Sequence, residues 1–379
     1  MKKKGSGFKN IFLLGGASLF NDVGSEMITP ILPFYITQLG GAGLAVGLIS
    51  GLREGLASLF KLFGGWFSDK MGKRMPFIFF GYFVSIIFRF LLSTINLWQY
   101  LIAFISFERF GKLRDAPRDA LITQSTHHRG RGFGIHQMLD TTGGIIGTIL
   151  VIFLFWKLQL GIKTIIIIAA GISAFSIIPL FFVREPKFKS TKISLLKGIH
   201  KLDKHLKYLI FVISFFTLGN FGLYLFLLLR AREISGNIVV PLVIYAVFNL
   251  VSAIFLVPFG NLSDKIGRKK VLLSGYILFF IISLGFIYVD SLFYLIILFA
   301  LYGLVFAITQ ANQKAFVSDI SGELKGTAFG FYSFVTGIVN ILGGLIAGIL
   351  WDISYSVMFT YISVIAFISI ILLIFVKKR

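Results

Sequence analysis

Ionisable side chains interrupt the long apolar stretches of this chain, and each needs a chemical or structural reason. At the centre of a bilayer a charged group costs at least about 2.5–3.5 kcal/mol. Asp22 and Glu26 lie four positions apart and share one helix face. Pro30 and Pro33 follow them and can kink or break the helix. The two carboxylates either carry a proton or bind a cationic group, or they form buried ion pairs with Arg53, Lys61, Arg89 or Arg109.

The N-terminal half of the chain carries most of these charges. Counted at about 1.5 Å per helical residue from the expected outer loops, they fall at or near the middle of a membrane, with Asp22 and Lys61 deeper towards the cytoplasm. Glu54 and Glu108 each adjoin an arginine. Because neighbouring positions point about 100° apart on a helix, we expect pairing between helices. The candidates for a proton-coupling site or a cavity lining are Asp22, Glu26, Arg53, Glu54, Arg89, Glu108, Arg109 and Asp140.

The C-terminal half offers mainly neutral polar side chains in its apolar runs, and Lys314 is its only charged group away from their ends. This asymmetry predicts coupling chemistry in the first half and hydrogen-bonding contacts to a solute in the second. The acids and bases within the runs nearly balance, so they favour neither an anionic nor a cationic solute. The candidates for solute contact are Asn220, Tyr224, Asn249, Gln310, Asn312, Lys314 and Asn340.

Other reactive groups are scarce. The chain contains no cysteine, which excludes disulfides and thiolate chemistry. It also lacks a phosphate-binding glycine loop, an H-E-x-x-H motif and a G-x-S-x-G motif. His127 and His128 lie in a basic stretch and are expected to be solvated, whereas His136 is either a hydrogen-bonded helix residue or a proton relay. We therefore expect no enzymatic activity, no metal site and no cofactor.

The elements that position these residues are predicted to be membrane-spanning helices. Of the 379 residues, 56% are hydrophobic and 14% are charged, against roughly 45–50% and about 25% in soluble domains. Apolar runs of about 18 residues or more, enough to cross about 30 Å of hydrocarbon, recur throughout. The sequence predicts an all-α polytopic membrane protein with twelve transmembrane helices, near 10–38, 43–67, 75–95, 97–119, 130–156, 161–183, 206–230, 238–262, 271–289, 292–317, 326–350 and 355–376.

The basic residues indicate how these helices are oriented. If both termini lie on the inner side, the outer loops hold only Lys157, Lys163, Arg230 and Arg232, and the inner segments are strongly basic. This distribution follows the positive-inside rule. It predicts a multi-pass protein of the cytoplasmic membrane with both termini cytoplasmic. The net charge of +21 would then face the cytoplasm and anionic lipid headgroups, and we expect no nucleic-acid partner.

A charged turn occurs twice in the same register. Residues 64–74 read GGWFSDKMGKR and residues 259–269 read FGNLSDKIGRK, with Asp69 and Asp264 195 positions apart. Gly72 and Gly267 permit a tight turn or a positive φ, and the aspartates can cap a helix or pair with a basic residue. Gly65 and Gly260, earlier in the two copies, permit close helix approach. The alternative is a basic connector that only orients the chain.

The polar segment 184–207 divides the twelve predicted spans six and six. The sequence therefore predicts an N-terminal six-helix bundle at 1–183, a cytoplasmic linker at 184–207 and a C-terminal six-helix bundle at 208–379. Two related halves of this kind imply a pseudo-two-fold axis along the membrane normal.

At the repeated turn the sequence resembles the major facilitator superfamily of secondary transporters. The family signature G-x-L-a-D-r-x-G-r-k is matched closely by the second copy and by the first with Phe67 where leucine is usual. The resemblance covers essentially the whole chain. It implies two six-helix bundles around a central cavity, transport by alternating access, a monomer, and loops that govern conformational switching. The matching residues are Gly65, Asp69, Lys70, Gly72, Lys73 and Arg74 in the first copy and Gly260, Asp264, Lys265, Gly267, Arg268 and Lys269 in the second.

The resemblance has two departures. Arg109 matches the arginine in the fourth-helix signature of proton-coupled members, but Leu113 stands where that signature has glycine. The fifth-helix signature of drug antiporters, G-x8-G-x3-G-P-x2-G-G, fits only at its first three glycines, which here are Gly134, Gly143 and Gly147. The second mismatch argues against drug/proton antiport.

These observations favour a proton-coupled secondary transporter, a symporter or an exporter, for a small organic solute. Its expected partners are the solute, protons and membrane lipids. An uncoupled facilitator whose buried charges are all structural is the alternative within transport. A membrane sensor or interaction protein that does not transport is the alternative from another class. The short polar stretches at either end of the sequence argue against it, because a sensor is expected to carry an added soluble domain.

Overall fold

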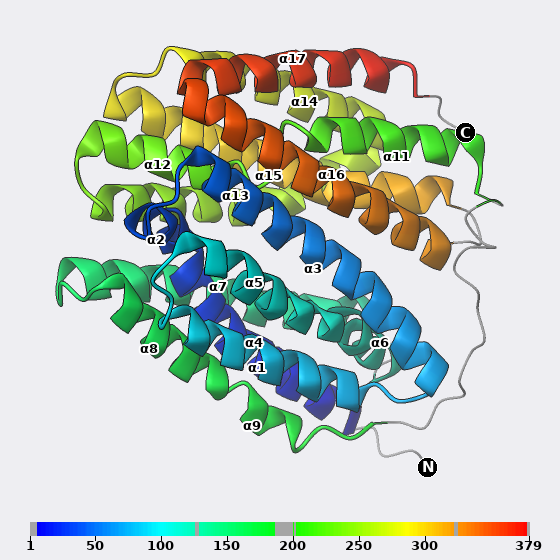
Figure 1. Ribbon diagram of the computed structural model, residues 1–379. Helices are drawn as coiled ribbons and strands as arrows, with labels where there is room; N and C mark the ends of the chain where they lie inside the picture. Colours follow the sequence, from blue (N-terminus) through cyan, green and yellow to red (C-terminus); the bar gives the residue numbers. More distant parts are fainter. Residues whose placement is uncertain (1–5, 126–128, 186–199, 201, 322–324, 377–379) are drawn as a thin grey trace. The chain divides into compact units, whose positions relative to one another are not determined.

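A computed structural model describes residues 6–125, 129–185, 200, 202–321 and 325–376 of the chain (Figure 1). Within these residues the backbone is α-helical, apart from short turns and two 3-10 segments, η1 (Thr29–Ile31) and η2 (Gly111–Arg114). The all-α class expected from the continuous apolar runs is therefore confirmed.

Nine helical segments within the described residues are long and apolar enough to cross a membrane, and each coincides with one of the twelve predicted spans. The other three predicted spans each coincide with two consecutive α-helices. These pairs are α1 (Ser6–Ile28) with α2 (Leu32–Gln38), α5 (Trp98–Phe110) with α6 (Asp115–Ser125), and α11 (Lys204–Thr217) with α12 (Tyr224–Ser235).

The first interruption lies at the prolines, as predicted. Helix α1 ends at Ile28 and the 3-10 turn η1 follows, with Pro30 at its second position. Pro33 lies in the first turn of α2, where the missing N–H costs no helical hydrogen bond. The break thus follows from local sequence alone.

The second interruption, between α5 and α6, depends on a neighbouring helix. A Cβ added at Gly111, the first residue of η2, would fall within 3.0 Å of the Ser85 hydroxyl and of the Gly81 carbonyl oxygen. Both belong to α4 (Met75–Leu92). Glycine at this position therefore allows the end of α5 to pack directly on the backbone of α4.

The described residues cluster into two compact units. One comprises Met1–Tyr35 and Leu56–Ile193, and the other comprises Ile36–Gly55 and Ser194–Arg379. Helix α3 (Gly43–Met71) is continuous across the boundary and contributes to both units. The two six-helix bundles expected at 1–183 and 208–379, on either side of the polar segment, stay a prediction.

The first unit is organised around α1. This helix packs along α7 (Arg129–Trp156) and α8 (Ile162–Ala174), while α4 packs on α5 and α8. The short helix α9 (Ile177–Leu180) also lies against α1. A core cluster of side chains from α1, α4, α6 and α9 comprises Ile11, Leu14, Ala17, Ile78, Tyr82, Leu121, Ile122 and Leu180.

The second unit is built mainly from long, nearly continuous apolar helices. Helix α13 packs along α15, α14 packs on α15 and α17, and α11 packs on α16. The bounds of these helices are Val239–Ile266 for α13, Arg268–Ile287 for α14, Leu292–Ile320 for α15, Lys325–Ile353 for α16 and Tyr355–Ile374 for α17.

Within the second unit the N-terminal half of α3 lies against α16 with almost no side chains between the backbones. A Cβ added at Gly47 would fall within 3.0 Å of the Gly344 carbonyl oxygen, and one added at Gly51 would approach the Asn340 carbonyl as closely. Only residues without a side chain allow such an approach. The Ser50 hydroxyl also donates a hydrogen bond of 2.9 Å to the Gly222 carbonyl oxygen.

The two repeated turns adopt the backbone predicted for them. Gly72 has φ +66 and Gly267 has φ +99, a region that glycine enters without steric cost. Asp69 pairs with Arg74 at 3.4 Å, and Asp264 pairs with Arg268. The aspartates therefore bind a basic residue of their own turn.

The close helix approach predicted at Gly65 and Gly260 is present in the first copy of the turn only. A Cβ added at Gly65 would lie 3.1 Å from the Cβ of Ala116, so this site is tight. At Gly260 the added Cβ would meet no described residue within 4 Å. The close helix approach expected at Gly260 was wrong for the described residues, because α13 leaves open space on that side.

Each repeated turn is also tied to the end of the last helical segment of its half. The Glu185 carboxylate, shortly after α9, accepts hydrogen bonds from the backbone N–H groups of Arg74 and Met75 at the start of α4. In the second half, Lys269 Nζ donates hydrogen bonds of 2.7 Å to the carbonyl oxygens of Ile374 and Val376 at the end of α17. A carboxylate thus caps the N-terminus of α4, and an ammonium group caps the C-terminus of α17.

Candidate functional site

A buried arginine organises the first group of charges in unit 1. Arg89, on α4, is 1% exposed, and its Nε donates a hydrogen bond of 3.1 Å to the Glu108 carboxylate of α5. Its Nη1 donates to the Asn21 side-chain oxygen of α1 at 3.0 Å and to the Ser173 hydroxyl of α8 at 2.8 Å. Four helices therefore meet at one guanidinium. We call Asn21, Arg89, Glu108, Arg109 and Ser173 the Arg89 group.

Glu108 is held between two guanidinium groups. Its Oε1 lies 3.1 Å from Arg89 Nη2, and its Oε2 lies 2.9 Å from Arg109 Nε. Pairing between helices is thus present, as expected from the helical geometry. The inference that Glu108 would not bind its sequence neighbour was wrong, because the long Arg109 side chain reaches back at the end of α5.

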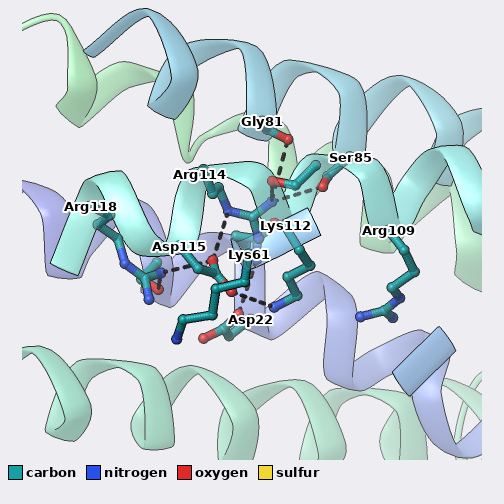
Figure 2. A network of polar contacts seen from close by, with 12 residues as sticks. Asp22, Lys61, Gly81, Ser85, Arg109, Lys112, Arg114, Asp115 and Arg118 are labelled. Carbon is teal, nitrogen blue, oxygen red and sulfur yellow. Dashed lines mark hydrogen bonds and ion pairs between the residues drawn. The ribbon is translucent and has the colours of Figure 1, made fainter. Parts of the chain in front are cut away.

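A second group of charges lies where η2 meets α6, and Figure 2 shows its members converging on one carboxylate. Asp115 lies 3.7 Å from Lys112 Nζ, 3.8 Å from Arg114 Nε and 3.8 Å from Arg118 Nη1. Asp119, one turn later, pairs with Arg118 and, at 3.4 Å, with Lys61 of α3. We call Lys61, Lys112, Arg114, Asp115, Arg118 and Asp119 the Asp115 group.

Arg114 is the most deeply buried member of the Asp115 group, at 1% exposed. Its Nη1 donates to the Gly81 carbonyl at 3.3 Å, to the Ser85 hydroxyl at 2.9 Å and to the Gly111 carbonyl at 3.0 Å. Its guanidinium stacks over the Tyr82 ring, 4.3 Å from the centroid. Arg114 is therefore buried because the 3-10 turn directs its side chain towards α4.

Ser85 joins the two groups. Its hydroxyl accepts the hydrogen bond from Arg114 and donates one of 3.3 Å to the Glu108 carbonyl oxygen. The Arg89 and Asp115 groups are therefore parts of one polar network through the first unit. Figure 2 shows the Arg109 side chain to one side of the Asp115 group.

Asp22 of α1 lies beside this network. Its carboxylate accepts a hydrogen bond of 3.0 Å from the Asn21 side-chain nitrogen, and Lys112, Arg118 and Arg114 are the cations that act on it most strongly. None of these three was among its predicted ion-pair partners. Asp140 of α7 lies close enough to Asp22 for the two negative charges to interact, and its Oδ2 is 3.3 Å from His136 Nδ1.

Two other candidates in the N-terminal half occupy different places. Glu26 is half-buried on α1, and a Cβ added at Gly144 of α7 would lie 3.5 Å from its Cγ. Arg53 is buried on the part of α3 that belongs to the second unit. Glu54, also in that part, accepts a hydrogen bond of 3.2 Å from the Tyr224 hydroxyl of α12.

Two of the predicted solute contacts come together in an aromatic cluster of the second unit. Asn220 accepts a hydrogen bond of 2.8 Å from the Tyr302 hydroxyl. The Tyr224 ring lies 6.4 Å from the Phe248 ring, which in turn stacks on Tyr302 at 5.4 Å. Asn220, Tyr224 and Glu54 are half-buried at the edge of this cluster. It therefore presents hydroxyl, amide and carboxylate groups beside flat apolar rings.

The remaining predicted contacts are spread over three helices. Asn312 is buried and donates a hydrogen bond of 2.6 Å to the Ile308 carbonyl of its own helix. Its neighbour Gln313, which we did not single out, bonds Tyr276 and Tyr332 at 3.4 Å each. Asn249 and Asn340 are half-buried, while Gln310 and Lys314 are exposed.

Several members of the network were not among the candidates chosen from sequence, namely Asn21, Ser85, Lys112, Arg114, Asp115, Arg118 and Ser173. One signal could have found part of the set. Lys112, Asp115 and Arg118 follow one another at intervals of three, which places them on one helix face. Within the described residues, no three His, Asp or Glu side chains are arranged to hold a metal ion.

Comparison with known proteins shows the family to which this chain belongs. The family model described as Major Facilitator Superfamily matches residues 14–236 and 208–379. An uncharacterized MFS-type transporter of Methanocaldococcus jannaschii is 45% identical over 378 residues, covering 97% of this chain and 95% of its own length. The multidrug resistance protein MdtH of Photorhabdus laumondii is 27% identical over 349 residues, covering 88% and 84%.

Solved structures show the same fold at low sequence identity. The nucleoside transporter NupG superposes with a TM-score of 0.78 at 14% identity, covering 97% of this chain and 99% of its own. A bacterial homolog of the human lysosomal transporter Spinster, in an inward-facing and occupied conformation, gives a TM-score of 0.80 at 14% identity, covering 99% and 97%.

Proposed function

Because this chain belongs to the major facilitator superfamily of transporters, we propose that it is a proton-coupled secondary transporter of a small organic solute. The family is not enzymatic, and the chain is a multi-pass integral membrane protein. We also propose its coupling ion, its class of solute, its membrane and the residues that take part in transport.

One observation supports proton coupling above the others, the placement of Glu108 between Arg89 and Arg109. A carboxylate with two alternative guanidinium partners can exchange one for the other when helices shift. A helix shift that separates it from both guanidinium groups would allow it to take a proton. We assign Glu108, Asp22 and Asp140 to coupling, with Glu26 as a further acid on the same helix as Asp22.

Solute contact is assigned to the aromatic cluster of the second unit, through Asn220, Tyr224 and Glu54. Aromatic rings with a few placed polar groups are typical of small-molecule sites. The relatives named as multidrug and nucleoside transporters differ in their cargo, so they do not narrow the choice. The cluster supports a solute with a flat apolar part and hydrogen-bonding groups.

We further propose alternating access, with the two repeated turns as the switch. Their ties to Glu185 and to the end of α17 support this role, since each turn would transmit a movement to the last helical segment of its half. The positive-inside distribution of basic residues supports a cytoplasmic membrane with both termini inside. By analogy with the family, the transporter acts as a monomer.

The alternative is an uncoupled facilitator, in which Glu108 stays paired with Arg89 and Arg109 throughout transport. Flux measurements separate the two. Ligands found by thermal shift on purified protein are tested in proteoliposomes with and without an imposed pH gradient. The coupled transporter accumulates solute only with the gradient, and Glu26→Gln or Glu108→Gln abolishes that dependence. Full gradient-driven uptake by both variants would rule out the coupling assignment.

A further inference from the structure

His136 is a buried titratable side chain that belongs to neither the Arg89 group nor the Asp115 group. His136 of α7 is 4% exposed. Its Nδ1 lies 3.3 Å from Oδ2 of Asp140, one turn along the same helix. Its Nε2 is buried and has no hydrogen-bond partner among the described residues. A buried polar atom without a partner costs about 1–3 kcal/mol, so this nitrogen calls for an explanation.

The chemistry of the pair fixes which nitrogen is free to act. An ionised carboxylate only accepts hydrogen bonds. When Asp140 binds Nδ1, that nitrogen must therefore carry the hydrogen. In the neutral imidazole the lone pair then lies on Nε2, the atom that lacks a partner. A proton taken up at Nε2 would give an imidazolium ion already paired with a carboxylate.

Glycines bring a second carboxylate to the pair. A Cβ added at Gly143 of α7 would fall within 3.0 Å of the Leu19 carbonyl oxygen of α1, and one added at Gly147 would come as close to the Val23 carbonyl. Helices α1 and α7 are thus almost in backbone contact. Asp22 of α1 and Asp140 of α7 are consequently near enough for their charges to interact.

Arg118, a cation that acts on both acids, already has other partners. Arg118 of α6 donates a hydrogen bond of 2.9 Å to the Ser18 hydroxyl of α1 and pairs with Asp115 and Asp119 of its own helix. The charged groups that act on Asp22 and Asp140 are Arg89 of α4, Lys112 and Arg114 of η2, Arg118 of α6 and His136 of α7. Arg118 itself interacts with Tyr82 of α4 and with Asp115 and Asp119 of α6.

We propose that His136, oriented by Asp140 and faced by Asp22, is the residue that binds and releases the transported proton. The proton comes from water on one side of the membrane, binds the Nε2 lone pair, and leaves to water on the other side. An O–H bond of a hydronium ion breaks as the N–H bond forms, and on release the N–H bond breaks as a water molecule on the other side accepts the proton. Arg118 and Ser18 position the acids, and Asp140 is a positioning residue for the imidazole. The inference rests on the proposed proton coupling.

The first test needs no solute. The full chain, with its histidines labelled at the ring nitrogens, is placed in lipid nanodiscs and followed by NMR as the pH is lowered. The signal lost in His136→Gln identifies the residue. We expect its Nε2 to pass from a lone-pair to a protonated state, and Asp140→Asn to move the midpoint. A single protonation state throughout, or an unmoved midpoint in Asp140→Asn, would overturn the proposal.

The second test uses the proteoliposome assay. His136→Gln should lose gradient-driven accumulation but keep solute exchange, whereas the matched control His205→Gln, at the start of α11, should behave as wild type. A wild-type flux that ignores the pH gradient would overturn the proposed coupling itself. A gradient response kept in His136→Gln would overturn only the role of His136. If His136→Gln does not fold, Asp140→Asn supplies the same comparison.

Discussion

Asp352, the penultimate residue of α16, caps the N-terminus of α3 at Gly43. Its Oδ1 accepts a hydrogen bond of 2.6 Å from the Gly43 N–H, and its Oδ2 accepts one of 2.8 Å from the Leu44 N–H. Both donors belong to the first turn of α3, where backbone N–H groups have no partner within the helix. A negative charge there also complements the helix dipole. The N-terminal end of α3 is therefore fastened to a helix about 300 positions away.

Asp352→Ala should loosen the N-terminal half of α3. Loss of a capping carboxylate costs about 1 kcal/mol, which corresponds to about a fivefold change in a local opening equilibrium. Since the native chain has no cysteine, Val46→Cys, at a fully buried position, supplies a single thiol. We expect a soluble maleimide to label it about five times faster when Asp352 is replaced. Asp290→Ala removes an exposed acid and is the control; equal rates in both backgrounds would contradict the capping role.

Gly47→Ala should destabilise the contact between α3 and α16. Its new Cβ would press on the backbone of Gly344, and overpacking of this kind costs about 1–3 kcal/mol. Thermal unfolding of purified protein should show a lower Tm. Gly171→Ala is the matched control, because a Cβ at that helical position meets no described residue within 4 Å. If the two variants melt alike, the backbone contact is not what holds the helices together.

Glu108→Gln should be far more costly than the same change at an exposed pair. It removes one partner of a buried ion pair, the carboxylate that Arg89 and Arg109 share, for which about 3–5 kcal/mol is typical. Glu233 pairs with Arg230 at 3.1 Å but is half exposed, so Glu233→Gln should cost less than about 1 kcal/mol. Comparison of the two melting curves checks this. Near-equal losses would mean that water reaches the Arg89 group.

Arg114→Lys should reveal what the guanidinium contributes beyond its charge. Lysine keeps the charge but cannot stack on Tyr82 or present a planar fork of donors to Gly81, Ser85 and Gly111. Unfilled acceptors at these sites should lower stability by about 2–3 kcal/mol, seen as a lower Tm. Arg184→Lys, on an exposed side chain, should leave the Tm unchanged. A Tm for Arg114→Lys equal to the wild-type value would reduce the role of Arg114 to charge alone.

Local chemistry explains what the sequence could predict. The helices could be predicted because the apolar runs are long enough and apolar enough to form membrane-spanning helices. Pro30 breaks the first helix through its own ring and missing N–H. Gly72 and Gly267 adopt positive φ because the tight turns need it and no other residue enters that region so easily. Each of these features is decided within a few residues, so one sequence without a partner helix is enough.

The Asp115 group could not be predicted in the same way. Lys112, Arg114 and Arg118 look like ordinary basic residues at the end of a span. The burial of Arg114 depends on the 3-10 turn at Gly111, which forms where α5 meets Gly81 and Ser85 of α4. The acceptors for Arg114 are mostly backbone carbonyls, which leave no trace in residue types. The cap at Gly43 is harder still, since nothing near Gly43 indicates an acid at position 352.

The continuity of α3 across two units has a consequence for the order in which the protein is made. Gly43 and its capping residue Asp352 are separated by 309 positions. At roughly 5–20 residues per second, the ribosome needs roughly 15–60 s to reach Asp352 after Gly43. Through that interval the glycine face of α3 has not yet met α16, while the rest of α3 already has its neighbours in the first unit. In a newly made chain the N-terminal half of α3 therefore lacks its packing partner until α16, in the last third of the chain, has been synthesised.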